Sequence, residues 1–433
     1  MTAGRVVTEN TTCLGCGCSC DDIDVVVEDG RIVEARRACP LGASWFGDGA
    51  VSTRIMIDGR DAPLDDAIHA AAALLVGASR PLVYLAPDIS CETQREAAGV
   101  ADLLHAALDT VSSATVLDAV LASQEVGFAS ATFGEIRNRA DVVVFWGVDP
   151  AERYPRYASR VAPEPLGLFV EAGRESRTVI GVDVGQDAAP AACDVRIAVA
   201  NHDEVALLTA LRALVSAPPG GAERYAEHRA PVWDRACELA PHLLAARYVA
   251  LVYDAEPSRT ATARRAGGRF AALHSLAQAL NERARCATSA LRAGGNRLGA
   301  EVVLTSQTGY PTAVDFSRGY PRYRPHDASA ASLLADGRAD AALIVGAAAQ
   351  LPSDLLARLD VVACAVVGPR ASDSPLGSAR VVVDTGVAGV HSGGTAIRAD
   401  DVPLPLRPSL TGAVSAADVV QAIAAAIGPR RRS

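Results

Sequence analysis

The sequence has 433 residues, half of them hydrophobic and only 4% aromatic, and 50 acidic against 41 basic side chains give a formal net charge of −9. A chain of this length exceeds the size at which one hydrophobic core keeps growing, so it predicts two or three domains. The acidic balance argues against nucleic acid as a partner, because phosphate binding needs clustered Lys and Arg. The dense basic cluster at residues 430–432 is more simply a solvated terminus.

Membrane and export signals are not evident. No run approaches the roughly 18 to 20 apolar residues that a membrane span needs, and residues 1–12 lack the apolar centre of a signal peptide. We therefore expect a cytoplasmic protein with no membrane partner. Four of the first five of its ten cysteines crowd into residues 13–20, which in a large chain of this kind favours metal binding over disulfides.

Cys13, Cys16, Cys20 and Cys39 follow the spacing C-x2-C-x3-C-x18-C, with Cys18 inside the loop. A short loop can aim several thiolates at one soft metal centre while its backbone amides face the anionic cluster. The pattern therefore predicts a [4Fe-4S] cluster bound by these four residues, with Cys18 as a bystander. A structural zinc site is the main alternative, although zinc sites normally pair two C-x2-C motifs or add His. A site without any metal is a third interpretation.

Secondary structure follows from the spacing of apolar residues. Residues 21–35 alternate around Asp29 and Gly30, which predicts a β-hairpin that returns Cys39 to the other cysteines. The expected helices are residues 64–76, 92–107, 204–215 and 270–281, and the expected strands are residues 82–86, 142–146, 179–184, 301–304, 341–345, 361–367 and 380–384. Residues 216–221 and 255–268 are predicted breaks. Short apolar strands alternating with helices predict an α/β fold with parallel sheets.

Four stretches, in order along the chain, resemble the B subunit of formylmethanofuran dehydrogenase, a member of the molybdopterin oxidoreductase superfamily. They are residues 11–42, 131–160, 294–325 and 394–408. The resemblance implies parallel-sheet α/β domains of the molybdopterin-oxidoreductase type with a small N-terminal β-rich iron-sulfur domain. The implied domains are residues 1–52 for the cluster, 116–267 for a central α/β domain, and 53–115 with 268–433 for a discontinuous α/β domain.

The resemblance also bears on the pterin cofactor. Redox-active members hold tungsten or molybdenum in a bis-pterin guanine dinucleotide centre through a Cys-His-Gly-Pro segment, and residues 112–118 here read Ser-Ser-Ala-Thr-Val-Leu-Asp. Because the ligand Cys and the proton-carrying His are both missing, we expect no such centre. Gly147, Asp149, Pro150 and Asp183 follow strands at positions that approach the guanosine in the family, so they are candidate cofactor-binding residues, with ordinary strand-to-loop geometry as the alternative.

By resemblance, the chain is expected to be the B component of a formyltransferase/hydrolase-type complex in tetrahydromethanopterin-linked one-carbon metabolism. It would act there as a scaffold or cluster carrier. Its expected partners are A-type amidohydrolase-like, C-type β-helical and formyltransferase subunits. The alternatives are a working tungsten or molybdenum enzyme that interconverts carbon dioxide and formate, and an interaction protein without a cluster. Residues 112–118 discriminate between the scaffold and the working enzyme.

Overall fold

The computed structural model describes residues 4–218, 231–256 and 268–431. The chain divides into two compact units, the first made of Met1–Ala114 with Ala293–Ser433 and the second of Thr115–Arg292. Each contains helices and a sheet with parallel strands, so the α/β prediction is confirmed. The assignment to the molybdopterin-oxidoreductase type, the N-terminal iron-sulfur domain and the three-domain division remain predictions.

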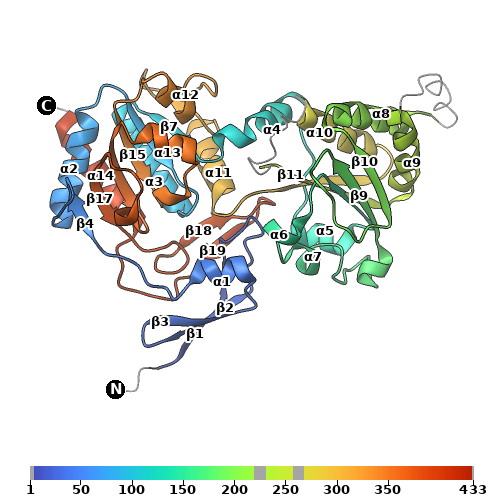
Figure 1. Ribbon diagram of the computed structural model, residues 1–433, viewed down its shortest axis with the longest axis horizontal. Coiled ribbons are helices and arrows are strands. Elements are labelled where there is room, and N and C mark those ends of the chain that lie inside the picture. The colour runs from blue at the N-terminus through green and yellow to red at the C-terminus, as the bar shows by residue number, and fades with distance from the viewer. Residues whose placement is uncertain (1–3, 219–230, 257–267, 432–433) are drawn as a thin grey trace. The chain divides into compact units, whose positions relative to one another are not determined.

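A nine-stranded sheet organises the first unit, in the order β14-β13-β7-β6-β15-β16-β17-β4-β5 (Figure 1). Its five central strands, from β7 to β17, run parallel, and the outer two on each side are antiparallel. The strands are β4 (Ile55–Ile57), β5 (Arg60–Asp61), β6 (Pro81–Leu85), β7 (Ala107–Thr110), β13 (Val314–Asp315), β14 (Arg322–Tyr323), β15 (Ala341–Val345), β16 (Ala363–Gly368) and β17 (Ala379–Asp384).

Both faces of this sheet are buried, which explains why its central strands are continuous apolar runs. In β6 the alternating side chains separate cleanly, with Val83 and Leu85 in one core and Leu82 and Tyr84 in the other. The first core is covered by α2 (Leu64–Val76), α3 (Cys91–Leu104), α11 (Arg297–Thr308) and α14 (Ala416–Arg431), and the second by α12 (Ala330–Ala335) and α13 (Ser353–Leu359), with short 3-10 turns η4 (Ala348–Gln350) and η5 (Ala371–Asp373).

The first unit also contains the cysteine region. The strands β1 (Val6–Thr11), β2 (Ile23–Glu28) and β3 (Arg31–Arg36) form an antiparallel sheet, followed by α1 (Pro40–Phe46). Asp29 and Gly30 both have positive φ, at 52° and 74°, as a tight two-residue hairpin turn requires. The predicted hairpin is therefore confirmed. A separate two-stranded ribbon consists of β18 (Gly394–Ile397) and β19 (Pro403–Leu406).

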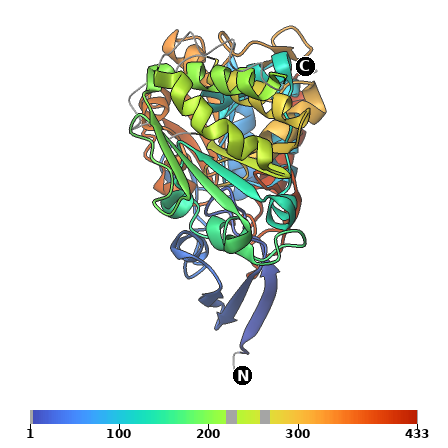
Figure 2. The ribbon, with the colours of Figure 1, turned by 90° about the vertical axis from the view of Figure 1, so that its right-hand side faces the viewer.

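The second unit is built on a five-stranded, all-parallel sheet in the order β10-β9-β8-β11-β12. Helices α8, α9 and α10 cover one face (Figure 2), and α5 and α7 pack aromatic side chains on the other. Its elements are α4 (Ser113–Val126), α5 (Phe133–Arg139), β8 (Val142–Trp146), α6 (Pro150–Arg153), α7 (Tyr157–Arg160), η1 (Gly173–Ser176), β9 (Thr178–Val184), β10 (Val195–Val199), η2 (Asn201–Asp203), α8 (Glu204–Ser216), α9 (Pro231–Ala245), β11 (Tyr248–Asp254), α10 (Arg269–Asn281) and β12 (Arg285–Leu291), of which α4 begins in the first unit. No described helix is long and apolar enough to cross a bilayer.

One predicted strand is wrong. Residues 301–304 lie inside α11, where Ala300, Val303 and Leu304 are buried at helical spacing. A four-residue apolar run cannot by itself distinguish a strand from one face of a helix. The helix expected at 92–107 ends earlier, at Leu104, because His105 has a φ of 53°, and Ala107 opens β7. Most of the predicted breaks at 216–221 and 255–268, and the side chains of residues 430–432, lie outside the described residues.

Candidate functional site

The first candidate site is the cysteine loop between β1 and β2. The loop turns back on itself, because the backbone N–H of Cys13 donates to the carbonyl of Cys20 at 2.9 Å and that of Ser19 donates to the carbonyl of Cys16 at 3.1 Å. Cys13, Cys16, Cys18 and Cys20 are all buried. The predicted trio and the extra cysteine thus lie within one closed turn of backbone.

Cys39 joins this loop from the start of α1. A methyl group built on Gly42 of α1 would lie 3.2 Å from the sulfur of Cys13 and 3.9 Å from the sulfur of Cys39, so this glycine permits close packing of helix and loop. Burial raises the pKa of the Cys13 thiol, and the neighbouring thiolates of Cys20, Cys16 and Cys39 raise it further, against a hydrogen bond from the Gly15 N–H. Cys13 therefore lies close enough to the other three predicted cysteines to be influenced by them.

The donor set has the chemistry of a soft-metal site, since it offers four thiols in a buried loop and a fifth, half-buried one at the start of α1. The sulfur atoms are not arranged as a cage, however. Among the described residues no group of three or more His, Cys, Asp or Glu side chains converges with the geometry of a metal site. The gathering of the cysteines is thus an observation, whereas coordination remains a prediction.

A pocket of about 670 Å³ lies beside the loop, within the first unit. Leu14 and Gly15 line it from the loop, and Trp45 lines it from α1. The loops that follow β6, β15 and β16 also line it, with Asp88, Ala347 and Pro369. The pocket therefore opens at the carboxyl ends of parallel strands, which is where open α/β sheets bind ligands.

Asp88 is the buried ionisable group of this pocket, with 2% of its surface exposed. Its carboxylate accepts the backbone N–H of Ala347 at 2.9 and 3.2 Å, which ties the β6 loop to the β15 loop. Burial raises the pKa of Asp88 to about 6, and the Ala347 hydrogen bond opposes this shift. The carboxyl group can therefore change its protonation state near neutral pH.

His391 borders the same pocket and holds the region after α1 in place. Its Nδ1 accepts the backbone N–H of Val387 at 3.2 Å, so Nε2 carries the proton and donates to the carbonyl of Gly49 at 2.8 Å. Burial lowers the pKa of His391. The neutral ring thus serves as a bridge between residues 49 and 387, which fits a structural role.

The segment of residues 112–118 begins with a hydroxyl–carboxylate contact inside the first unit. Ser112 is fully buried and donates from Oγ to the carboxylate of Glu301 on α11 at 2.8 Å, and its Oγ lies 3.1 Å from Oγ1 of Thr110. Ser113 then opens α4. Ser112, the first residue of this segment, is thus held by hydrogen bonds within the first unit.

The predicted cofactor-binding residues of the second unit follow β8 and end β9. Gly147 has φ of 57° and donates its N–H to Val182. Asp149 caps α6 by accepting the N–H of Ala151 at 2.9 Å, with Pro150 as the first helical residue. Asp183 accepts from the Arg196 guanidinium at 2.9 Å. Both carboxylates therefore have structural partners, and cofactor binding by these residues remains a prediction.

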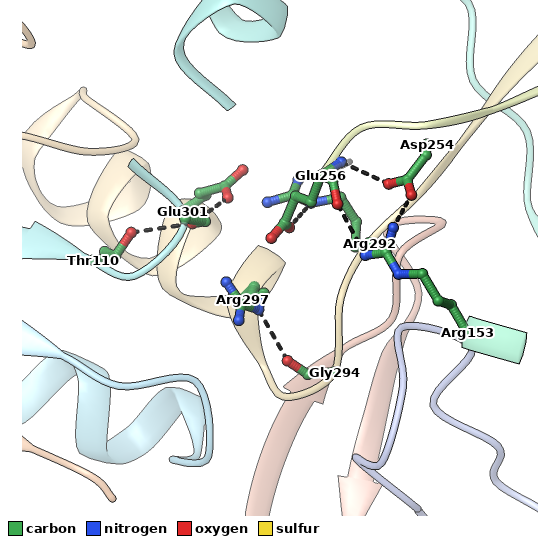
Figure 3. Close-up of polar contacts among 9 residues, drawn as sticks. Thr110, Arg153, Asp254, Glu256, Arg292, Gly294, Arg297 and Glu301 are labelled. Carbon is green, nitrogen blue, oxygen red and sulfur yellow. Dashed lines mark hydrogen bonds and ion pairs between the residues drawn. The ribbon is translucent and has the colours of Figure 1, made fainter. Parts of the chain in front are cut away.

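Sequence reasoning missed a network of buried charges at the carboxyl edge of the second unit's sheet. Arg153 of α6 pairs with Asp254, the last residue of β11, and also donates to the carbonyl of Glu256 at 2.9 Å (Figure 3). Arg292, directly after β12, pairs with the carboxylate of Glu256 at 2.5 Å. The acidic Asp-Ala-Glu sequence at the end of an apolar strand could have indicated buried carboxylates. Their arginine partners could not be identified from the sequence, because they are distant along the chain.

A second part of this network lies deeper. Arg269 and Glu204 are 3% and 0% exposed, and the guanidinium Nε donates to the carboxylate at 2.8 Å. The indole N–H of Trp146, the last residue of β8, donates to the same carboxylate oxygen at 2.9 Å. These contacts join β8 to α8 and α10 at the strand ends.

Comparison with known proteins identifies relatives over nearly the whole chain, although no protein-family model matches it. The B subunits of tungsten-containing formylmethanofuran dehydrogenase 2 from Methanocaldococcus jannaschii and Methanococcus maripaludis are 32% and 30% identical to it over 415 residues, covering 93% of this chain and 93% of each relative. The B subunit of the formyltransferase/hydrolase complex Fhc from Methylorubrum extorquens is 29% identical over 348 residues, covering 78% of this chain and 86% of that protein.

A solved structure is also similar. One chain in the crystal structure of the formyltransferase/hydrolase complex (FhcABCD) from Methylorubrum extorquens, determined with methylofuran, matches with a TM-score of 0.72 and 26% sequence identity. The match covers 88% of this chain and 100% of that chain. Sequence and structure comparisons therefore lead to the same group of proteins.

Proposed function

Since the chain belongs to the family of formylmethanofuran dehydrogenase B subunits, we propose that it is the B component of a formyltransferase/hydrolase-type complex in tetrahydromethanopterin-linked one-carbon metabolism, and that it serves there as a scaffold without a redox centre of its own. The observation that carries this proposal is the segment of residues 112–118. This segment has neither Cys nor His, and the hydroxyl group of Ser112 donates a hydrogen bond to the carboxylate of the buried Glu301. A thiolate ligand and an imidazole proton carrier are both missing from the place where redox-active relatives have them.

The rival function is a working tungsten or molybdenum enzyme that interconverts carbon dioxide and formate. It is favoured by the names of the two archaeal relatives, which are described as tungsten-containing and are 32% and 30% identical to this chain. The two functions require different metal contents in the same complex, so one preparation can separate them.

The test is metal and pterin analysis of the complex after anaerobic purification with its partner subunits. We expect substoichiometric tungsten, molybdenum and pterin, and no reduction of viologen dye with formate as donor. Stoichiometric tungsten or molybdenum together with rapid dye reduction would restore the rival function. The variants Ser113→Ala and Thr115→Ala would then be used to look for an oxygen ligand in this segment.

Under the same proposal, Cys13, Cys16, Cys20 and Cys39 hold a [4Fe-4S] cluster. Their spacing, the burial of Cys13, Cys16 and Cys20 in one loop, and the close packing of α1, which begins after Cys39, against this loop support it. We expect about four irons per chain in the anaerobic protein. Cys39→Ala is expected to lower the iron content sharply, whereas the matched control Cys237→Ala, an exposed cysteine of α9, leaves it unchanged. Zinc at one per chain would support the alternative structural site, and equal iron in both variants would refute the cluster.

We further propose that the partners are A-type amidohydrolase-like, C-type β-helical and formyltransferase subunits. The similarity to a chain of the FhcABCD complex supports a multisubunit assembly. Permanent interfaces of this kind typically bury more than about 2,000 Å². Co-expression with homologues of these subunits should therefore yield a complex that survives size-exclusion chromatography, and elution of this chain alone in every combination would contradict the proposal.

A further inference from the structure

The three-stranded sheet at the start of the chain has two edges of very different character. Its order is β1-β2-β3, so β1 and β3 each have one side without a strand partner in the described structure. The β3 edge has charged, exposed side chains at Arg31, Glu34 and Arg36, with an ion pair of 3.0 Å between the last two. Charged edges of this kind are how natural sheets prevent further strands from pairing.

The β1 edge is less strongly charged, with Glu9 as the exposed acidic residue within the strand and Arg5 directly before it. Val6 and Val7 are adjacent, so their side chains point to opposite faces of the sheet, and they are 56% and 40% exposed. Neither face of the strand is therefore covered at this end by the described parts of the chain. An exposed strand with β-branched side chains on both faces is a template for pairing with another extended chain.

A hollow of about 440 Å³ adjoins this strand within the first unit. Val6, Val27, Val51 and Leu410 give it apolar walls. Ser409 also lines it, and its hydroxyl oxygen is buried without a hydrogen-bond partner among the described residues. The hollow can thus receive an apolar side chain.

An exposed negative charge on β1 adds a third requirement for a segment that would pair with this strand. Glu9 of β1 is exposed, and no ion pair involves it within residues 4–218, 231–256 and 268–431. A segment running beside β1 would bring a side chain close to this carboxylate, and a Lys or Arg at that position would complement it.

We propose that β1 is an assembly edge, to which another subunit of the complex adds an extended segment as a fourth strand. The row of backbone N–H and C=O groups on the open side of β1 requires an extended polypeptide. Its matching features are an apolar side chain for the hollow and a basic side chain beside Glu9. This inference rests on the proposed function, since it needs a complex with other subunits, and it specifies which surface of this chain one of them uses.

The first experiment compares two lysine variants of the same sheet in the co-expressed complex. Val6→Lys/Val7→Lys places charge on the open edge at exposed positions, and retention of this variant on tagged partner subunits should fall by about tenfold or more. The matched control is Val33→Lys on β3, whose wild-type side chain is 54% exposed, and it should be retained like the wild type. Circular dichroism and the thermal midpoint should be the same for both variants, which excludes misfolding.

The second experiment needs no substitution and uses the intact wild-type complex. Hydrogen exchange of the amides at residues 6–9 should be slow if β1 is paired on both sides, and slower than that of the other edge strand at residues 31–36. Failure of the wild type to assemble would overturn the proposed function. Normal assembly with unchanged retention of the double variant and fast exchange in β1 would overturn the edge proposal alone. A mass that reveals pairing of two copies through β1 would overturn the choice of partner.

Discussion

The two units have sheets with parallel strands, but the carboxyl ends of these strands differ. In the first unit the loops after β6, β15 and β16 line a pocket of about 670 Å³. In the second unit the corresponding ends of β8, β11 and β12 carry side chains that pair with one another: Arg153 with Asp254, Arg292 with Glu256, and Arg269 with both Glu204 and the carbonyl of Asp254. The same architecture therefore provides open space in one unit and an internal charge network in the other.

This difference also appears in how buried carboxylates are accommodated. Asp88 in the first unit is held by backbone N–H groups, and no ion pair involves it in the described structure, so burial raises its pKa to about 6. Burial also raises the pKa of Asp254 in the second unit, but the Arg153 guanidinium opposes the shift. A carboxylate that faces a cavity is left sensitive to pH, whereas one with a guanidinium partner acts as a link between strand ends.

The largest expected effect is in the charge network. Glu204→Ala leaves Arg269 buried without its carboxylate and removes the acceptor of the Trp146 indole, so the free energy of unfolding should fall by about 3 to 5 kcal/mol. Tryptophan fluorescence during urea unfolding would measure it. The matched control is Glu238→Ala, an exposed acidic residue of α9, which should change stability by less than about 0.5 kcal/mol. Equal effects of the two variants would mean that the network does not hold the second unit together.

The next largest effect concerns Asp88 in the pocket of the first unit, and it is a dependence of the free energy of unfolding on pH. Because the pKa of Asp88 is raised to about 6 from 3.8, its contribution to stability is present in full below pH 3.8 and is lost as the pH rises through about 6. Asp88→Asn should remove this loss. Between pH 4 and 7 the wild type should therefore lose about 2 kcal/mol relative to the variant.

Urea unfolding at a series of pH values would measure this difference. Burial also raises the pKa of Asp109 to about 6. Because Asp109 is present in both proteins, its titration does not contribute to the difference between the two curves. Asp66→Asn, at an exposed position on α2, serves as the control and should follow the wild-type curve. Parallel curves for Asp88→Asn and the wild type would contradict the assignment of Asp88 as a titrating group of the pocket.

The smallest effect tests Asp149, which the sequence nominated for cofactor binding and which caps α6 in the structure. Loss of the cap in Asp149→Ala should cost about 1 kcal/mol, and Asp149→Ser, which can also accept the Ala151 N–H, should recover most of it. Metal and pterin content of the complex should be the same in both variants. A change in cofactor content that Asp149→Ser does not restore would instead support the cofactor role. The carboxyl edge of the second unit would then be a ligand-binding edge, as proposed for open α/β sheets in general.

Much of the fold could be predicted locally. The strands at 82–86, 142–146, 179–184 and 341–345 are short apolar runs that become β6, β8, β9 and β15, because a parallel strand covered on both faces needs apolar side chains at every position. The Asp-Gly turn could also be predicted from the sequence. The structure of residues 301–304 could not, because a short apolar run fits both a strand and a helix. Packing against the first core favours the helix α11.

The candidate site divides in the same way. Spacing alone singled out Cys13, Cys16, Cys20 and Cys39 and the absence of a Cys-His pair at residues 112–118, because these are properties of neighbouring residues. The partners of distant residues were decided only by the tertiary structure: Glu301 beside Ser112, Arg153 beside Asp254, and the hollow beside Val6. Such contacts join segments up to several hundred residues apart, and no local pattern encodes them. The contact between Arg153 and Asp254 arises because the parallel sheet of the second unit brings the ends of separate strands to one edge.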